Sequence, residues 1–144
     1  MKYLLKLVSV EELSFKLNRV QLAPNQRLDV KPQFSRQVRK ANDNKKLNFI
    51  ALSVKIESTE AEPKPFDINV GLVGMYELES EDYTAEEERA FVIEATSQLY
   101  PYLRAAVTNL TAQAYITPLN LPVINGPIFP EDRDVYAFAP GSIS

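Results

Sequence analysis

The sequence predicts one α+β domain in which a four-stranded antiparallel β-meander is packed by one long helix, kinked at Pro101. Three observations favour this class. Apolar and polar residues alternate along several stretches before residue 80, short polar turns separate these stretches, and a helical stripe of apolar residues begins after Thr84. With 144 residues the chain has the size of a single domain. The predicted parts are strands at about 2–79, a helix at about 84–114, an apolar proline-rich loop at 115–130 and a tail at 131–144.

The first strand is expected within Lys2–Val20, and the spacing of its apolar residues predicts a bend. Apolar residues occupy positions 5 and 7 and then positions 8 and 10, so the alternation changes phase inside the strand. A slip of this kind is typical of a β-bulge. We therefore expect an irregularity near Ser9–Glu12.

The second strand is expected after a longer crossover at Asn18–Arg27. Pro32 falls within its alternating stretch, and proline cannot donate a hydrogen bond to a neighbouring strand. The stretch is therefore predicted to form an edge strand or to contain a bulge. Its weakly alternating apolar positions are Leu28, Val30, Phe34 and Val38.

The third and fourth strands carry the strongest alternation. Apolar residues recur at nearly every second position of residues 47–57 (LNFIALSVKIE) and 66–78 (FDINVGLVGMYEL), which predicts strands that bury one face. The polar turns ANDN and STEAEPKP precede them. Inside the fourth strand, Gly71 and Gly74 are expected to mark a close approach of another backbone or a bend.

The long helix is expected to start at Thr84, because Thr84 and Glu87 have the spacing of a capping box. Its apolar residues cover more than one side, and only Glu94 and Arg104 carry a charge within positions 90–130. One sheet covers one side of a helix. A second copy of the chain is therefore the expected cover for the remaining sides.

The loop at 115–130 (YITPLNLPVINGPIFP) contains four prolines and no charged residue. The prolines exclude a regular helix and a central strand. Most of the other residues are apolar, unlike those of a solvated linker, so this loop must lie against something. The tail at 131–144 shows no helical period and is expected to be frayed.

The composition excludes several kinds of site. The chain contains no cysteine and no histidine, which removes disulfides, thiolate nucleophiles, the usual zinc sites and the commonest general base. None of its four glycines belongs to a phosphate-binding loop with a lysine. We therefore assign no catalytic residue, no metal ligand and no cofactor.

Charge and hydropathy argue against a nucleic-acid partner and against membrane insertion. The net charge is −3, the apolar run at the start ends at Glu11 without a cleavage pattern, and no stretch reaches the length of a membrane span. A cytoplasmic location is the expectation. One basic cluster is interpreted as the solvated face of a hairpin and not as a phosphate-binding patch. Its members are Arg36, Arg39, Lys40, Lys45 and Lys46.

The surplus of apolar surface leaves three interpretations open. It is either the interior of an oligomer alone, or a surface that binds other chains, or part of a small antiparallel-sheet enzyme or ligand carrier. The enzyme or carrier requires a closed cavity with convergent polar groups. A protein that binds chains requires an open, elongated apolar trough.

Residues 99–125 (LYPYLRAAVTNLTAQAYITPLNLPVIN) resemble the helix and the following loop of the SecB protein-export chaperone family. Weaker agreement extends to EELSFKLN near the start and to GMYEL in the fourth strand. The chain departs from the family's pattern at Gln113, Ala114 and 116–118, and the family's second, C-terminal helix is not evident. The matching positions are Pro101, Tyr102, Arg104, Leu119, Asn120, Leu121 and Asn125.

The resemblance implies an ATP-independent holdase chaperone that assembles as a homotetramer, a dimer of dimers with helices sandwiched between sheets. Its clients would be unfolded or precursor proteins, bound as extended segments in a long apolar groove. The expected lining comes from the first strands, the crossover and the loop, and only Leu119 and Leu121 belong to the matching motif. The lining residues are Phe15, Leu17, Val20, Leu22, Leu28, Val30, Phe34, Tyr115, Ile116, Leu119, Leu121 and Val123.

The resemblance also implies two kinds of partner besides clients. The SecB family docks the SecA translocation motor through a patch on its sheet, and some SecB-like proteins instead guard an antitoxin. The positions that correspond to the docking patch are Glu12, Lys16, Asp67 and Asn69, of which Glu12 alone keeps the family's residue. The resemblance therefore implies either SecA or an antitoxin as a further partner.

Overall fold

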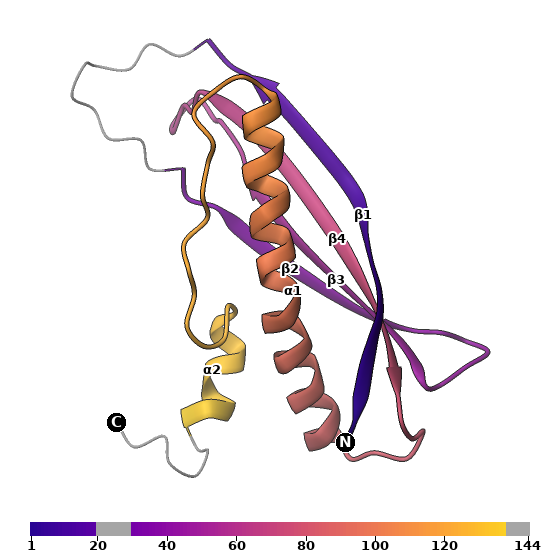
Figure 1. Ribbon diagram of the computed structural model, residues 1–144. Coiled ribbons are helices and arrows are strands. Elements are labelled where there is room, and N and C mark those ends of the chain that lie inside the picture. Colours follow the sequence, from indigo (N-terminus) through magenta and orange to yellow (C-terminus); the bar gives the residue numbers. More distant parts are fainter. Residues whose placement is uncertain (20–29, 138–144) are drawn as a thin grey trace.

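A computed structural model of the chain describes residues 1–19 and 30–137. The long helix lies across one face of a single sheet, and the segment after it runs back beside it (Figure 1). The predicted fold class, a four-stranded antiparallel sheet packed by a long helix, is confirmed. The elements are strands β1 (Tyr3–Leu17), β2 (Gln33–Lys40), β3 (Leu47–Ile56) and β4 (Phe66–Leu78), and helices α1 (Ala85–Gln113) and α2 (Pro130–Ala137).

The strand order is β1-β4-β3-β2, so a meander describes only the last three strands. β1 pairs with β4 instead of β2, which makes β1 and β2 the two edges of the sheet. Neighbouring strands of a meander are joined by tight turns, and the long connection between β1 and β2 frees the chain from that constraint. β2 is an edge strand as Pro32 predicted, and it begins directly after that proline.

β1 contains the predicted irregularity. Its register against β4 shifts between Val10 and Glu12, inside the expected region, and shifts once more between Leu5 and Leu7. Each shift inserts one residue, which restores the inward direction of the apolar side chains after the change of phase.

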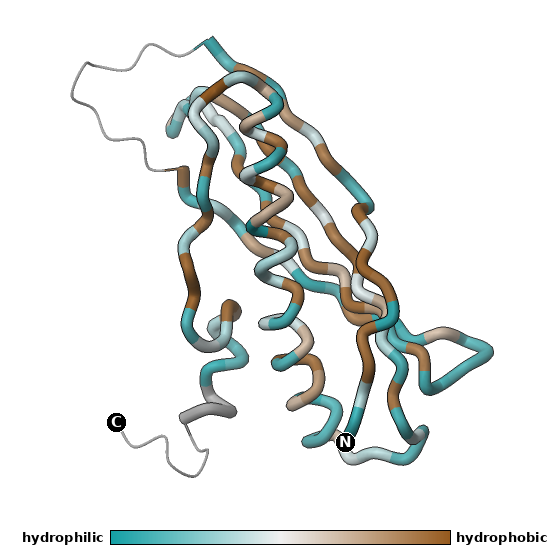
Figure 2. Tube along the Cα trace, in the orientation of Figure 1, coloured by the Kyte–Doolittle hydropathy of each residue, from teal (hydrophilic) through white to brown (hydrophobic). Residues whose placement is uncertain are grey.

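The core lies between the sheet and α1. Every second residue of β3 and β4 is buried, and Figure 2 shows the same alternation of hydrophobic and hydrophilic positions along the strands. The Tyr76 hydroxyl donates to the backbone oxygen of Ala95 at 3.2 Å, which satisfies a polar group inside the core. The buried residues that α1 adds to this core are Phe91, Ala95, Leu99, Tyr100, Leu103 and Val107.

Both ends of α1 have defined local causes. Thr84 Oγ1 accepts from the Glu87 amide and the Glu87 carboxylate accepts from the Thr84 amide, each at 3.1 Å, so the predicted capping box is present. At the other end Ala114 caps the helix, and Tyr115 follows with a φ of 59°. This left-handed conformation favours glycine, yet a tyrosine occupies it here with its side chain 98% exposed.

The first part of the predicted tail has regular structure, since residues Pro130–Ala137 form the helix α2. Proline at the first helical position and acidic residues in the first turn both suit a helix start. An element of eight residues is too short to show a clear helical period, which explains why the sequence pattern missed it. The part of the predicted tail after residue 137 lies outside the described residues.

Gly74 is the point at which β4 and α1 approach each other most closely among the glycines described. A Cβ atom at this position would lie 2.8 Å from Leu99 Cδ2 and 2.9 Å from Tyr76 Cε2, both shorter than ordinary contact. At Gly71 the nearest atom would be Ser53 Cβ at 3.7 Å, an ordinary contact. The close neighbours of Gly74 are therefore side chains of the core and not another backbone.

We expect Gly74→Ala to destabilise the fold by about 1 to 3 kcal/mol, because the added methyl group overfills a packed core. The matched control, Gly71→Ala, should change the free energy of unfolding by less than about 1 kcal/mol. Urea denaturation followed by circular dichroism measures both. Equal stability losses for the two variants would contradict this account of the contact between helix and sheet.

Candidate binding surface

The edge strand β1 exposes five large apolar side chains. Each of them is between 50% and 62% exposed. The register of β1 against β4 puts some of them on each face of the sheet, because directly opposed residues of antiparallel strands share a face. These residues, the β1 surface, are Leu4 and Leu7 on the outer face and Val10, Leu13 and Leu17 on the helix face.

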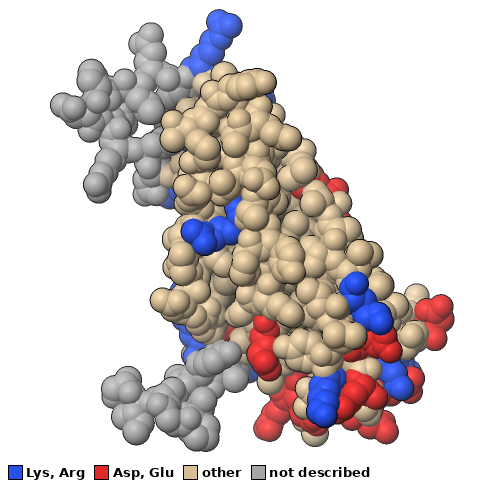
Figure 3. Space-filling model, viewed as in Figure 1, with Lys and Arg blue, Asp and Glu red and all other residues tan. Residues whose placement is uncertain are grey.

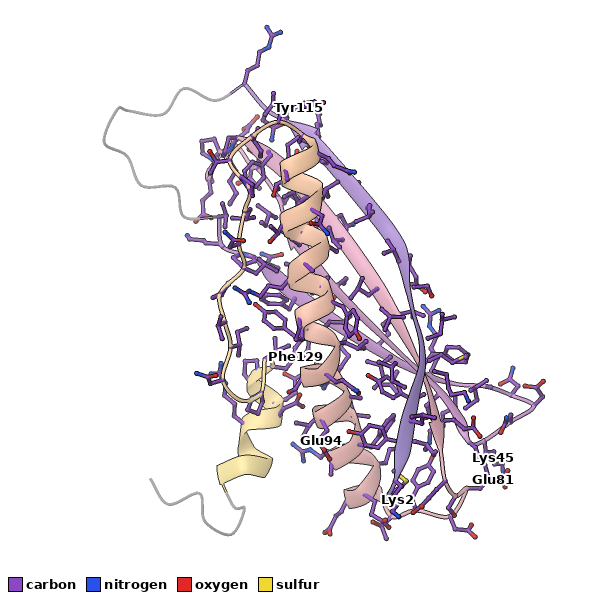
Figure 4. The ribbon with its side chains drawn as sticks, in the orientation of Figure 1. Lys2, Lys45, Glu81, Glu94, Tyr115 and Phe129 are labelled. Carbon is purple, nitrogen blue, oxygen red and sulfur yellow. The ribbon has the colours of Figure 1, made fainter. Side chains whose placement is uncertain are left out.

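A second exposed group lies on α1 and beyond its end. Tyr102, Tyr115 and Val123 are 50%, 98% and 68% exposed. Tyr115 sits at the far end of α1, the end of the molecule that the C-terminal end of β1 also reaches (Figures 1 and 4). Figure 3 shows that charged atoms gather around the start of α1, whereas uncharged atoms cover most of the helix and the segment beside it. This face of the molecule therefore carries few charges.

The residues predicted to line one groove lie at two opposite edges of the sheet. Phe15 and Leu17 lie on β1 and Phe34 on β2, which are opposite edges of the sheet. Phe34 packs edge to face against Tyr100, whose hydroxyl donates to the backbone oxygen of Pro122 in the loop. Phe34 is therefore linked to the loop, while Phe15 packs on Phe66 at the other edge, with ring centroids 5.9 Å apart.

The predicted lining residues also differ in exposure. Leu17, Tyr115 and Val123 are exposed, whereas Leu121 is 2% exposed and belongs to the core. Leu121 is therefore not available on the surface of this chain. Those that lie outside the described residues are Val20, Leu22 and Leu28. Those that are half-buried against the core are Phe15, Val30, Phe34, Ile116 and Leu119.

Residues 116–129, which we call the strap, make up most of the apolar loop predicted from the sequence. It runs from the end of α1 back along this helix to the start of α2, between the labelled Tyr115 and Phe129 (Figure 4). Leu121 and Phe129 are buried in the core, and Ile116, Ile124 and Ile128 pack partly against it. The expectation that this loop lies against something is confirmed, and its own chain supplies much of the contact.

One member of the basic cluster does not lie on a solvated face. Arg36 stands opposite Leu52 in the register, so it points to the helix side. Its guanidinium donates to both carboxylate oxygens of Asp132, at 2.7 and 3.1 Å, and lies 4.6 Å from the centre of the Phe129 ring. The Arg36 and Asp132 side chains are only 13% and 5% exposed. The sequence pattern missed this pair because its members lie 96 positions apart.

Lys40 also serves a contact inside the fold. Its ammonium group lies 2.9 Å from the Glu88 carboxylate and 5.3 Å from the centre of the Tyr83 ring. The hydrogen bonds to Glu88 and Tyr83 raise the pKa of Lys40 above its ordinary value. Lys40 thus ties β2 to the start of α1.

The four positions that correspond to the family's docking patch lie together on the outer face of the sheet. Lys16 pairs with Asp67 and Glu12 with Gly71 in the register between β1 and β4, and Asn69 lies between them. Asp67 accepts from the Ser58 amide at 2.6 Å and from Asn18 Nδ2 at 3.2 Å. The Ser58 bond is the main cause that lowers the pKa of Asp67. This carboxylate therefore stabilises the fold itself.

A concavity of about 260 Å³ adjoins these positions and is open to solvent. It lies on the outer face, near Ser14, Lys55 and Asp67. The ligand-binding alternative requires a closed cavity between helix and sheet, and this concavity does not have that form. The residues of the described ranges contain no group of three or more acidic side chains placed to hold a metal ion. Neither helix in that part of the chain is long and apolar enough to cross a membrane.

The described residues form an open four-stranded sheet with one helix layer and an exposed apolar edge strand, which is the architecture of a small α+β protein. A family model described as preprotein translocase subunit SecB matches residues 2–129. The chain belongs to the SecB family.

Two relatives give the extent of the similarity. The protein-export protein SecB of Anaplasma phagocytophilum (strain HZ) is 31% identical over 78 residues, which are 53% of this chain and 49% of that protein. The alignment thus spans about half the length of that relative. The Mycobacterium tuberculosis Rv1957 SecB-like chaperone, solved in complex with a peptide from the Rv1956 HigA1 antitoxin, superposes with a TM-score of 0.72. It is 20% identical, and the match covers 88% of this chain and 93% of that one, so it shows the shared fold.

We expect Asp67→Asn to destabilise the fold by about 1 to 2 kcal/mol near pH 7, because it weakens a charge-assisted hydrogen bond to the Ser58 amide. The folded-state pKa of Asp67 is below the ordinary value of 3.8, so its contribution is complete above that value and disappears as the pH falls through the folded pKa. The difference from the parent protein should therefore shrink in acid.

Denaturation in urea between pH 2 and pH 7 measures this difference. Glu60→Gln, in the exposed turn before β4, is the control for removing one negative charge. A stability difference for Asp67→Asn that does not change with pH would contradict the assigned role of the carboxylate.

Proposed function

We propose that the chain is an ATP-independent chaperone of the holdase type, which binds extended apolar segments of non-native proteins. The observation that carries this proposal is the set of half-exposed or fully exposed aliphatic and aromatic side chains on β1, at Tyr115 and at Val123. Membership of the SecB family supports it. The proposal uses no nucleotide, no metal and no other cofactor, and no catalytic step.

The binding energy would come from burial of client side chains. Each square ångström of apolar surface removed from water contributes roughly 25 cal/mol, and the ordering of a flexible client consumes much of this gain. A single site is therefore weak and releases quickly. Several sites on one assembly would raise the overall affinity through effective concentration. Binding the unfolded state also delays folding by mass action.

The assembly that we propose is a homotetramer, a dimer of dimers in which the helices lie between the sheets. One edge of β1 has no neighbouring strand in the described chain, and the strand exposes large apolar side chains on both faces. An exposed apolar edge of this kind is a template for pairing with another chain. On α1 the exposed Tyr102 and the scarcity of charge between residues 90 and 113 support a second helix as cover.

Two cellular settings are proposed, both in the cytoplasm. The curated relative is named a protein-export protein, which supports the transfer of precursor proteins to the SecA motor. Docking would involve Glu12, Lys16, Asp67 and Asn69, which the register brings together. The alternative is the guarding of an antitoxin, supported by the structural relative that holds an antitoxin peptide and matches more of this chain.

The chaperone proposal predicts that a stoichiometric amount of the assembly suppresses the aggregation of a chemically denatured client. The double variant Tyr115→Ser, Val123→Ser should bind the client about tenfold more weakly, because two apolar side chains no longer contribute contact. Light scattering and a fluorescent unfolded client measure the two effects. Gln113→Ser is the control, since it shortens an exposed polar side chain on the same turn. Absence of suppression at stoichiometric excess would refute the holdase function.

The assembly proposal predicts that Leu13→Lys lowers the molecular mass in solution. A lysine in the middle of the β1 surface would place a charge at the apolar contact between chains. Asn42→Lys adds the same charge in the turn before β3 and should leave the mass unchanged. Native mass spectrometry with size-exclusion chromatography distinguishes the states. If the parent protein is a monomer in solution, the proposed tetramer is wrong, and so is the proposed contact between chains through β1.

A further inference from the structure

Side chains of α1 hold the strap through its backbone. Tyr100 Oη donates to the Pro122 oxygen at 2.5 Å, and Arg104 Nε donates to the Leu121 oxygen at 2.7 Å. One turn later Thr108 Oγ1 lies 3.1 Å from the Leu119 oxygen. Positions on α1 rise as positions in the strap fall, so the strap runs antiparallel to the helix. These donors lie four residues apart and therefore on one side of α1.

The contacts used here suit a segment that contains proline. A proline has no amide proton, but it keeps its carbonyl oxygen, and the bonds from Tyr100 and Arg104 end on backbone carbonyl oxygens. The one Thr108 hydroxyl proton has three acceptors at 3.1 Å, which are the backbone oxygens of Arg104 and Leu119 and the side-chain oxygen of Asn120. The Leu119 amide is the strap donor in a further bond, to Thr111 Oγ1 at 2.8 Å. Prolines in an occupant would therefore lose few hydrogen bonds, and the identity of most side chains is not read by these donors.

Apolar walls complete the site. Phe34 of β2 and Tyr100 of α1 pack together beside the strap, and the strap buries Leu121 and Phe129 among core residues. We call the space between α1 and β2 that the strap fills the channel. It provides side-chain donors for backbone oxygens on one side and apolar side chains around them, a combination suited to an extended apolar segment.

The far end of the strap is fixed by charge. The two-pronged contact of Arg36 with Asp132, which we call the latch, joins β2 to the first turn of α2. Arg36 also donates to Thr96 on α1, and Arg89 of α1 donates to the Glu131 oxygen at 2.8 Å. The strap between these anchors changes direction at Gly126, whose φ is +100° and around which a Cβ would meet no atom within 4 Å.

We propose that the channel is a binding site for extended, apolar, proline-containing chain segments, that the strap occupies it in cis, and that the latch keeps it closed. The inference rests on the proposed function and names the class of segment and the regulation of its site. Opening of the latch would release the strap and offer Tyr100, Arg104 and Thr108 to a client in trans. The exposed side chains of Tyr115 and Val123 would make the first contact while the channel is still closed.

The test uses the full chain and the variant Asp132→Asn, which keeps the size of the side chain and removes its charge. The first measurement is amide hydrogen exchange at strap residues, with α1 as the internal reference. The second is the affinity for a fluorescein-labelled peptide of residues 117–130 (TPLNLPVINGPIFP), measured by anisotropy. Glu131→Gln is the matched control, because its carboxylate is 65% exposed and 4.0 Å from Arg36.

Asp132→Asn should speed exchange in the strap by about tenfold and tighten peptide binding by the same factor, since apparent affinity follows the fraction of open channels. Glu131→Gln should change neither. Faster exchange without tighter binding would overturn the channel as a site, and unchanged exchange would overturn the latch. If circular dichroism shows that Asp132→Asn is unfolded, the variant Arg36→Lys replaces it. This variant keeps the positive charge but loses the two-pronged contact with Asp132. It must show faster exchange in the strap and tighter peptide binding, both smaller than the changes expected for Asp132→Asn.

The same samples separate this inference from the holdase proposal. Suppression of client aggregation by the parent protein, together with identical peptide binding by parent and Asp132→Asn, would overturn the channel and leave the holdase function standing. Tighter peptide binding by the variant, with no suppression of aggregation by any sample, would support the channel and refute the holdase function.

Discussion

The structure depends on one constraint, which is that α1 is apolar on several sides while the domain has a single sheet. The sheet covers the side that carries Phe91, Leu99 and Leu103. The strap covers a neighbouring side, where Tyr100 and Arg104 bind its backbone. A third side, marked by Tyr102, stays exposed in the single chain. The described residues contain no second sheet, and the proline-rich strap covers part of α1 in its place. The side of α1 that stays exposed is the one that the proposed assembly and clients would cover.

Much of the fold could be predicted because its causes are local. Alternation along β3 and β4 reflects burial of every second residue, and the capping box at Thr84 lies within four positions. The pairing of β1 with β4 could not be predicted in this way, since the distance along the chain is 49 positions between Leu17 and Phe66 and 75 between Tyr3 and Leu78. The helix α2 is too short to show a period and is fixed by Arg36, 96 positions before Asp132. Such contacts leave no trace in a local pattern.

The candidate site shows the same division between local and distant causes. The sequence identified the strap as too apolar for solvent, and this was correct. The donors on α1 fix the backbone of the strap and thereby the direction of its side chains. Leu119 is half-buried as a result, and Leu121 lies in the core. The β1 surface was missed as a distinct feature, because an exposed leucine and a buried one look alike in an alternating strand. The change of phase predicted the register shifts against β4, but it did not indicate that β1 is an edge strand.

The two edges of the sheet differ in chemistry. β1 exposes large apolar side chains on both faces and carries charges of both signs, whereas β2 carries only positive charges, at Arg36, Arg39 and Lys40. If copies joined β1 to β2, each added copy would present a fresh edge, and a head-to-tail sheet would grow without limit. In the proposed assembly the exposed apolar side chains of β1 would pack against those of a second β1 and not against the positive charges of β2. A contact between two β1 edges would have two-fold symmetry and would close on itself, which would prevent the growth of a fibre.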